Sequence, residues 1–264
     1  MGLSFFAIGQ TKLFHYHKPA NCICSVMWNN INLERCLARI KSQHDARDKS
    51  PGEIKPALTI SRMSGAGGHT VASQLINFLA PSAPPGSQWT VFDKALMAKV
   101  LEEHGLPKML ADSMPEGKET MVMELIKQLR TGHPSTSKVV EHTIETIWRL
   151  AMGGYVVLVG RGANVITAGL PGVFHVRLVG SEALRVINTQ RVYNYDKRKA
   201  QELVKSDDDA KRRYLREYFG KDIDDPQLYH LVINTDRFSY DTSARLIADT
   251  FLDWFQHQSA ARSA

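Results

Sequence analysis

The chain has 264 residues, of which 43% are hydrophobic and 23% charged, and this composition is typical of a globular protein with one main domain and appendages. No apolar run approaches the roughly 18 residues that cross a bilayer, which argues against a membrane-spanning protein. The net charge of +6 permits nucleic acid as a partner. The basic residues are dispersed and lack an aromatic stacking array, however, so the sequence favours a phosphate-rich small substrate over nucleic acid.

The N-terminal part does not have the pattern of a domain. Residues 1–26 show no clear periodicity and are expected to form an irregular extension. An alternative is that translation starts at Met27 and that the preceding residues are not native. Residues 27–56 predict a helix followed by a polar linker that contains proline and glycine. The main domain is expected over residues 57–258, and residues 259–264 are expected to form a disordered tail.

The cysteines and the first residues bear on the cellular compartment. An odd number of cysteines at this spacing makes neither a disulfide framework nor a full zinc site; they are Cys22, Cys24 and Cys36. The apolar patch near the N-terminus has no basic region ahead of it, which argues against a secretory signal. Both observations favour a reducing, cytoplasmic location.

Residues 57–70 read A-L-T-I-S-R-M-S-G-A-G-G-H-T and are the most informative stretch of the chain. Leu58–Ile60 is an apolar run typical of a buried parallel strand, and the apolar spacing from Thr70 to Leu79 predicts a helix. A glycine loop between a strand and a helix is the arrangement in which backbone N–H groups bind phosphate. A phosphate loop usually ends Gly-Lys-Ser/Thr, and here Gly68 takes the place of the lysine. An ordinary strand-to-helix turn is the alternative.

Beyond this loop, short apolar strands alternate with amphipathic helices. Further strands are predicted at residues 89–92, 155–159, 173–178 and 231–234. Helices are predicted at residues 94–104, 119–130 and 137–152, and a last helix is expected to be capped by Asp241 or Thr242. This alternation implies right-handed crossovers, and therefore an α/β fold with a parallel sheet and helices on both faces.

Polar clusters fall where the predicted strands end. They are Ser61–Thr70, Asp93, Gly160–Gly162 and Asn234–Asp236. A further charged cluster, Asp207–Arg213, lies in a predicted helical stretch. Because α/β sheets bind ligands at the carboxyl ends of their strands, the sequence predicts a binding site at this edge.

In these clusters the chain resembles the cytidylate kinase-like family, a branch of the nucleoside monophosphate kinases within the P-loop fold. The resemblance extends from about Leu58 to Phe255 and rests on the segments Ser61–Gly68, Phe92–Lys94, Val159–Asn164 and Tyr229–Asp236, in this order. It implies a P-loop NTPase-type parallel sheet with a helical acceptor-binding insert and a helical lid. It also implies transfer of a phosphate from ATP to CMP or a similar monophosphate, with Mg²⁺ bridging the donor phosphates.

The resemblance implies that the glycine loop holds ATP through Ser64, Gly65, Ala66, Gly67, Gly68, His69 and Thr70. Arg62 stands where orthodox cytidylate kinases have glycine, and it could supply the cation that Gly68 lacks or pair with an acidic neighbour. Thr70 stands where a hydroxyl meets Mg²⁺, although helix capping would also explain it. The simpler interpretation of His69 is a surface residue at the start of the helix.

For acceptor binding, the resemblance implies Asp93, Lys99 and Arg161. The carboxylate of Asp93 could orient the acceptor or hold metal-bound water, or the residue could simply cap a helix. Lys99 stands in place of an arginine and keeps the charge without the bidentate fork. Gly162 replaces the aspartate that helps to hold the acceptor sugar, which argues against CMP itself more than against the reaction class.

Arginines of the implied lid are expected to close over the phosphates and to neutralise developing charge. The candidates are Arg185, Arg191 and Arg212, with Lys211 and Arg213 in the same region. A solvated helix face is the alternative for each of them. The acidic residues 207–209 are expected to pair with these arginines or to begin the next helix.

The leading hypothesis is an ATP- and Mg²⁺-dependent phosphotransferase that acts on a nucleoside monophosphate, CMP- or dCMP-like, or on a related phosphorylated small molecule. The alternative is a nucleotide-binding regulator or degenerate kinase with little turnover, which Gly68, Gly162 and His230 favour. A third hypothesis, an RNA-binding adaptor, predicts binding that falls steeply with salt. The sequence neither names the acceptor nor indicates the oligomeric state.

Overall fold

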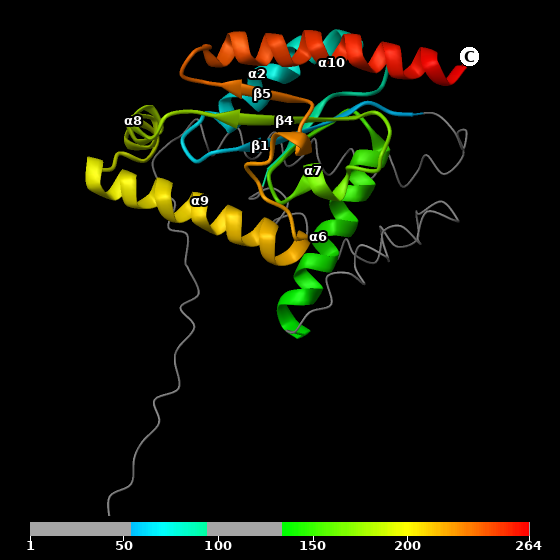
Figure 1. Cartoon of the computed structure of the whole chain (residues 1–264). Helices are drawn as coiled ribbons and strands as arrows, with labels where there is room; N and C mark the ends of the chain where they lie inside the picture. The colour runs from blue at the N-terminus through cyan, green and yellow to red at the C-terminus, as the bar shows by residue number, and fades with distance from the viewer. Residues whose placement is uncertain (1–53, 94–133, 264) are drawn as a thin grey trace, which may run out of the picture.

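The computed structural model describes residues 54–93 and 134–263, with side chains for residues 54–93 and 143–258 (Figure 1). The expectations for residues 1–53, for Lys99 and for the helices at 94–104 and 119–130 lie outside the described residues. Within the described part, no helix has both the length and the apolar character that a membrane crossing requires.

A parallel sheet with the strand order β2-β3-β1-β4-β5 forms the centre of the domain. Its strands are β1 (Ala57–Arg62), β2 (Thr90–Phe92), β3 (Val156–Val159), β4 (Val173–Val179) and β5 (Leu231–Asn234). β1 lies in the middle, where Leu58 is in register with Val157 of β3 and with Phe174 of β4. The strands predicted from the apolar runs are confirmed, and so is the α/β fold with a parallel sheet.

The helices are α2 (Gly68–Leu79), α6 (Pro134–Gly153), α7 (Ala163–Ile166), α8 (Glu182–Tyr193), α9 (Lys197–Phe219) and α10 (Tyr240–Ser263), with the 3-10 turns η1 (Ala80–Ser82) and η2 (Pro226–Leu228). α2 and α6 confirm the helices predicted at 70–79 and 137–152. The predicted cap of the last helix was wrong: the hydroxyl of Ser239 accepts a hydrogen bond from the backbone N–H of Thr242 at 3.0 Å. α10 also continues through residues 259–263, where the sequence predicts a tail.

Helices cover both faces of the sheet (Figure 1). On one face, α2 and α10 pack an apolar layer against the central strands, with Leu75 and Phe251 fully buried. On the other face, α6 and α7 pack around Ile147 and Leu158, and Phe219 of α9 joins this layer. A parallel sheet that is covered on both faces needs strands that are apolar on both sides, which is why continuous apolar runs identified its strands.

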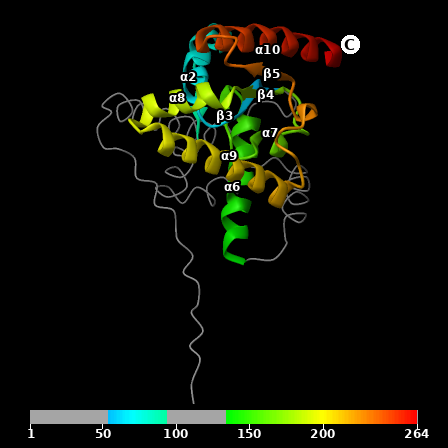
Figure 2. The same cartoon turned by 60° about the vertical axis from the view of Figure 1, so that its left-hand side comes forward.

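α8 and α9 form a helical hairpin beside the carboxyl ends of the strands (Figures 1 and 2). Asn194 ends α8 with a left-handed backbone (φ 53°), and the carboxylate of Asp196 caps α9 by accepting from the N–H of Lys199 at 2.8 Å. The two helices share a small apolar core of Val186, Ala200 and Val204. The acidic residues 207–209 lie in the middle of α9, and not at the start of a helix.

Candidate functional site

The loop between β1 and α2 depends on glycine at two positions. Gly65 and Gly67 both have a φ of 78°. A Cβ at Gly65 would lie 2.3 Å from the carbonyl oxygen of Arg185, and a Cβ at Gly67 would lie 2.2 Å from the ring of Tyr240. Gly67 also precedes α2 without giving it a side-chain cap. The loop therefore combines a tight backbone with an uncapped helix N-terminus, which together favour a bound anion.

Arg62, the last residue of β1, lies across the loop where a phosphate loop would carry its lysine. A Cβ at Gly68 would lie 2.7 Å from Cγ of Arg62, and a Cβ at Gly160 would lie 2.2 Å from its Nη1. The arginine stem thus fills the space over Gly68, and its guanidinium reaches the end of β3. Burial lowers the pKa of Arg62, and the charges of Asp93 and Asp207 oppose this effect. Because arginine stays charged in proteins, it supplies a permanent cation here.

Asp93 and His69 come together at the same edge of the sheet. Asp93 follows β2, and its Oδ2 lies 3.4 Å from Nδ1 of His69, which is 52% exposed. Thr70, the next residue of α2, is also exposed. The structure therefore brings the predicted acceptor residue next to the predicted donor loop, and it agrees with the interpretation of His69 as a surface residue at the helix start.

The turn after β3 places Arg161 next to Arg62. Gly160 donates its N–H to the carbonyl of Ile60 at 3.0 Å, which ties the turn to β1. Arg161 has a left-handed backbone (φ 57°), and its charge lowers the pKa of Arg62. A Cβ at Gly162 would lie 3.0 Å from the ring of Phe219 of α9. An aromatic ring of α9 thus takes the space that a side chain at position 162 would need.

Four cations from β1, β4 and α9 line a narrow crevice between the loop and α9. It is lined by Arg62, Arg177, Asp208, Lys211, Arg212 and Ile223. The lining side chains leave little free volume between them while α9 lies in this position. Such a concentration of positive charge favours an anionic ligand, and movement of α9 or of the lining side chains would make room for it.

Arg177 was missed by the sequence reasoning, because it lies inside the apolar strand β4. It is only 4% exposed. Its Nη1 donates to Oγ of Ser61 at 2.9 Å, and its Nη2 donates to Asp224 at 2.8 Å. Arg212 of α9 donates to the other oxygen of Asp224 at 2.9 Å. An arginine in an otherwise apolar buried run was the signal that could have identified it.

A second ionic cluster joins α9 directly to the glycine loop. Asp208 accepts from the backbone N–H of Ser64 at 2.7 Å and from Nη1 of Arg185 at 2.6 Å. Arg185 also donates to the carbonyl oxygens of Ser64 and Gly180, both at 3.0 Å. Lys211 lies 3.3 Å from Asp208 and contacts Oγ of Ser64. Burial, followed by the charge of Arg62, lowers the pKa of Lys211 from 10.5 to about 8.

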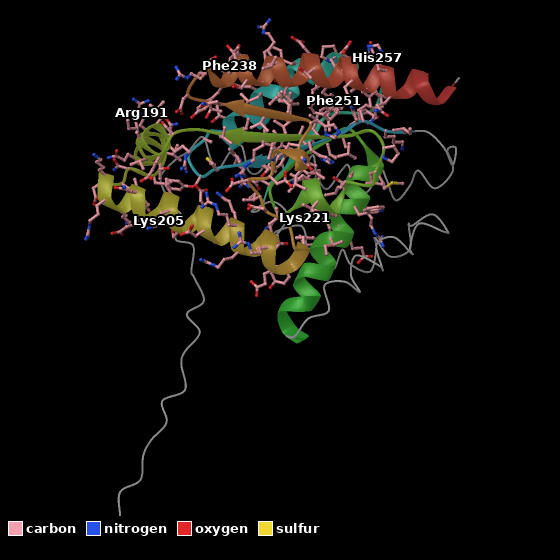
Figure 3. All side chains as sticks on the ribbon, viewed as in Figure 1. Arg191, Lys205, Lys221, Phe238, Phe251 and His257 are labelled. Atoms are coloured by element: carbon pink, nitrogen blue, oxygen red, sulfur yellow. The ribbon has the colours of Figure 1, made fainter. Side chains whose placement is uncertain are left out.

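Other predicted residues lie apart from this crevice. Arg191 is exposed on α8, on the side away from α9 (Figure 3). The cluster Asn234–Asp236 closes the end of β5, because Thr235 donates its N–H to Val179 at 2.8 Å and Asp236 accepts from the N–H of Ser181 at 2.8 Å. The pairing expected for the acidic residues is confirmed by Asp208 and also by Asp209, which lies 3.3 Å from Arg212.

The oxygen atoms near the loop suit Mg²⁺. Thr70 offers an exposed hydroxyl in the first turn of α2, and Asp93 offers a carboxylate beside the preceding residue, His69. The described residues contain no group of three or more side chains that could hold a metal alone. Mg²⁺ typically uses one or two protein oxygens together with substrate phosphates and water, so this donor set fits it.

Comparison with known proteins agrees with this geometry. A crystal structure of an uncharacterized protein from Eubacterium ventriosum is similar over 77% of this chain and 99% of its own, with 18% identity and a TM-score of 0.57, which shows the fold. The structure of TT1252 from Thermus thermophilus also matches, over 76% of this chain and 98% of its own, with 14% identity and a TM-score of 0.42. No curated protein matches. Residues 57–237 match the sequence profile of the cytidylate kinase-like family, and the chain therefore belongs to that family.

Proposed function

We propose that this protein is an ATP-dependent phosphotransferase that passes the γ-phosphate to a nucleoside monophosphate, CMP- or dCMP-like, or to a related phosphorylated small molecule. The observation that supports this best is the position of Arg62. Its stem fills the space over Gly68, so the missing lysine is matched by a cation from another position. Phosphoryl transfer depends on such cations and N–H donors more than on a protein nucleophile.

The donor phosphates would lie on the loop of residues 64–70. The N–H groups of the loop and of the first turn of α2 would bind the phosphate oxygens, and Arg62 would neutralise the transferring group. Thr70, with Asp93 nearby, would hold Mg²⁺, which when bound supplies charge to the donor phosphates. Lys211 and Arg212 would close over the phosphates from α9 and exclude water.

The acceptor would bind between β2 and β3. Asp93 would orient the attacking oxygen, and Arg161 would hold the acceptor phosphate by charge-assisted hydrogen bonds. Lys99 stays a prediction for the same role. Because Phe219 occupies the space beside Gly162, the acceptor sugar would meet an aromatic ring where orthodox enzymes offer a carboxylate. This difference favours an acceptor other than CMP itself.

A nucleotide-binding regulator with little turnover is the second candidate. One observation favours it, namely that α9 closes the crevice and fixes the glycine loop by its own carboxylate. Under this alternative, nucleotide binding would reposition α9 for a partner without rapid chemistry. The cytoplasmic location expected from the sequence stays a prediction under either function.

The first experiment is a screen for ADP release from ATP and Mg²⁺ with CMP, dCMP, UMP, AMP, GMP and other phosphorylated metabolites. Turnover with one acceptor establishes the transferase and identifies its substrate. Arg62→Ala should lower kcat by about 100- to 1,000-fold, as removal of one transition-state donor does in other enzymes. The matched control is Arg198→Ala, because Arg198 is exposed on α9 away from the crevice.

A double variant tests the role of Arg62 more directly. In Arg62→Ala the space over Gly68 is empty, so Gly68→Lys added to it can place an ammonium on the loop. The double variant should recover part of the lost turnover, whereas Gly68→Lys alone should clash with the stem of Arg62 and stay impaired. ATP binding without turnover by the wild type, for any acceptor, would support the regulator. No ATP binding at all would overturn the phosphate-loop assignment.

A further inference from the structure

Asp208 occupies a position on the glycine loop that suits an anion. Its carboxylate accepts from the backbone N–H of Ser64 at 2.7 Å, and the neighbouring Asp207 accepts from the hydroxyl of Ser64 at 3.3 Å. The loop therefore already binds negative charge, and the charge comes from the chain itself. Asp208 is 7% exposed, so this is a buried contact and not a surface ion pair.

The groups around Asp208 are those that would bind a phosphate oxygen. Arg185 donates one N–H to the carboxylate, and the ammonium of Lys211 lies 3.3 Å from it. A backbone N–H, a guanidinium and an ammonium that converge on one point make a binding site for any oxyanion. A carboxylate and a phosphate cannot share it, because two like charges in a partly buried space repel each other.

α9 carries Asp208 in its middle and is the same helix that closes the crevice. Near this point α9 also reaches the body through Arg212 and Asp224, at 2.9 Å. These contacts are ionic, so an incoming polyanion can replace them with contacts of the same kind. An apolar contact offers no such exchange.

We propose that Asp208 is a gate residue whose carboxylate occupies the phosphate position on the glycine loop until a nucleotide phosphate displaces it. This inference rests on the proposed function and adds its regulation. Displacement of Asp208 releases Arg185 and Lys211 toward the phosphate and frees α9 to move. The nucleotide-free protein thus holds its own donor site closed, and donor affinity is set by competition with an internal anion.

The test is calorimetric titration of ADP with Mg²⁺ into the wild type and three variants. Asp208→Asn removes the competing charge and keeps the shape, so it should bind ADP about tenfold more tightly or better. Asp208→Glu restores the charge and should stay closer to the wild type. Glu202→Gln removes one negative charge from an exposed position of α9 and should leave the affinity unchanged. Unchanged or weaker binding by Asp208→Asn overturns the gate, whereas no ADP binding by any variant or by the wild type refutes the proposed function instead.

If Asp208→Asn does not fold, a second measurement tests the gate in protein that keeps Asp208. Spin labels at Lys205 on α9 and at Asp253 on α10, both exposed, report the distance between the two helices by double electron–electron resonance. Cys22, Cys24 and Cys36 are replaced by serine for this experiment. ADP should lengthen the distance as Asp208 leaves the loop. A distance that ADP does not change, at a concentration that saturates binding, contradicts the gate.

Discussion

α9 and α10 contact the rest of the domain in different ways. α10 packs on the sheet through apolar side chains, among which Ala244, Ile247 and Phe251 have no exposed surface. The middle of α9 meets the carboxyl edge of the sheet through a hydrogen bond of Asp208 and an ion pair of Arg212, and only its C-terminal end, at Phe219, joins an apolar layer. In Figure 3, Phe251 lies between α10 and the sheet.

The difference separates a helix that holds the sheet from one that borders the proposed binding site. Apolar burial is non-directional and roughly proportional to area, so no nucleotide can compete with it. Ion pairs at the edge where we propose that phosphate binds can be exchanged for contacts with a phosphate. We therefore expect α10 to determine the stability of the fold, and α9 to determine what the site binds and under which conditions.

The largest effect is expected on the α10 side. Phe251→Ala should lower the free energy of unfolding by about 3–5 kcal/mol, because it removes a fully buried ring and leaves a cavity. Leu246→Ala in the same helix should cost less than about 1 kcal/mol, since Leu246 is among the exposed residues. Urea unfolding measures both. Equal costs for the two variants would contradict the view of α10 as an apolar anchor.

Acid should weaken the sheet itself. His175 in β4 lies 2.9 Å from Oγ1 of Thr59, and burial, followed by the charge of His230, lowers its pKa from 6.5 to about 3. Between these two values the unfolded chain binds the proton and the folded chain does not. The free energy of unfolding should therefore fall as the pH falls from 6.5 toward 3, by on the order of 4 kcal/mol. In His175→Asn this part of the slope should be missing from urea unfolding measured across the same pH range; an unchanged slope would assign it to other groups.

A smaller effect is expected on the α9 side. Asp224→Asn leaves the buried Arg177 with a neutral partner and also loosens Arg212, so it should cost about 1–2 kcal/mol. Asp224 is 41% exposed, and solvent screening keeps the cost below that of a fully buried pair. Asp222→Asn is the control, because Asp222 lies 4.0 Å from Arg216 in an exposed pair and should cost less than about 0.5 kcal/mol. If added salt reduces the destabilisation by Asp224→Asn and by Asp222→Asn equally, then the pair of Asp224 with the buried Arg177 behaves like the exposed pair of Asp222 with Arg216.

The same contrast explains what the sequence could predict. The strands and the helix α2 follow from local apolar patterns, and α10 differs from its prediction only at its ends. The order of the strands and the contacts of α9 do not follow from local patterns. Asp208 is separated from Ser64 by 144 residues, and Arg177 is separated from Ser61 by 116. Nothing in a charged helical run says which of its carboxylates will be buried.

The glycine loop contains features that the sequence predicts and features that it does not, within a few residues. Its position between a strand and a helix, and the substitution of Gly68 for lysine, could be read from the sequence. For Arg62 the sequence leaves two options open, supplying the missing cation or pairing with an acidic neighbour. The fold is needed to decide between them, because the direction of a side chain at the end of a strand does not follow from the local sequence. The roles of Arg191 and Lys99 stay predictions.

The smallest and most specific effect concerns the pH dependence of binding. Burial lowers the pKa of Lys211 to about 8, so its ammonium loses the proton as the pH rises through that value. If Lys211 contacts a donor phosphate, ADP should bind up to about tenfold more weakly at pH 9 than below pH 8, because tenfold fewer molecules carry the proton. The terminal phosphate of ADP does not contribute, since its last pKa is near about 6 and it is fully ionised in this range.

The stability of the protein should change in the opposite direction over the same range. The unfolded lysine keeps its proton up to its ordinary pKa of 10.5, whereas the folded one loses it near 8. The unfolded state therefore binds more protons in this window, and the free energy of unfolding should rise with pH there. Lys211→Arg stays charged and should remove both trends together, in calorimetry and in urea unfolding. If Lys211→Arg removes only the pH dependence of stability, Lys211 contributes to folding but does not contact ADP. If it also removes the pH dependence of ADP affinity, Lys211 contacts the bound ADP.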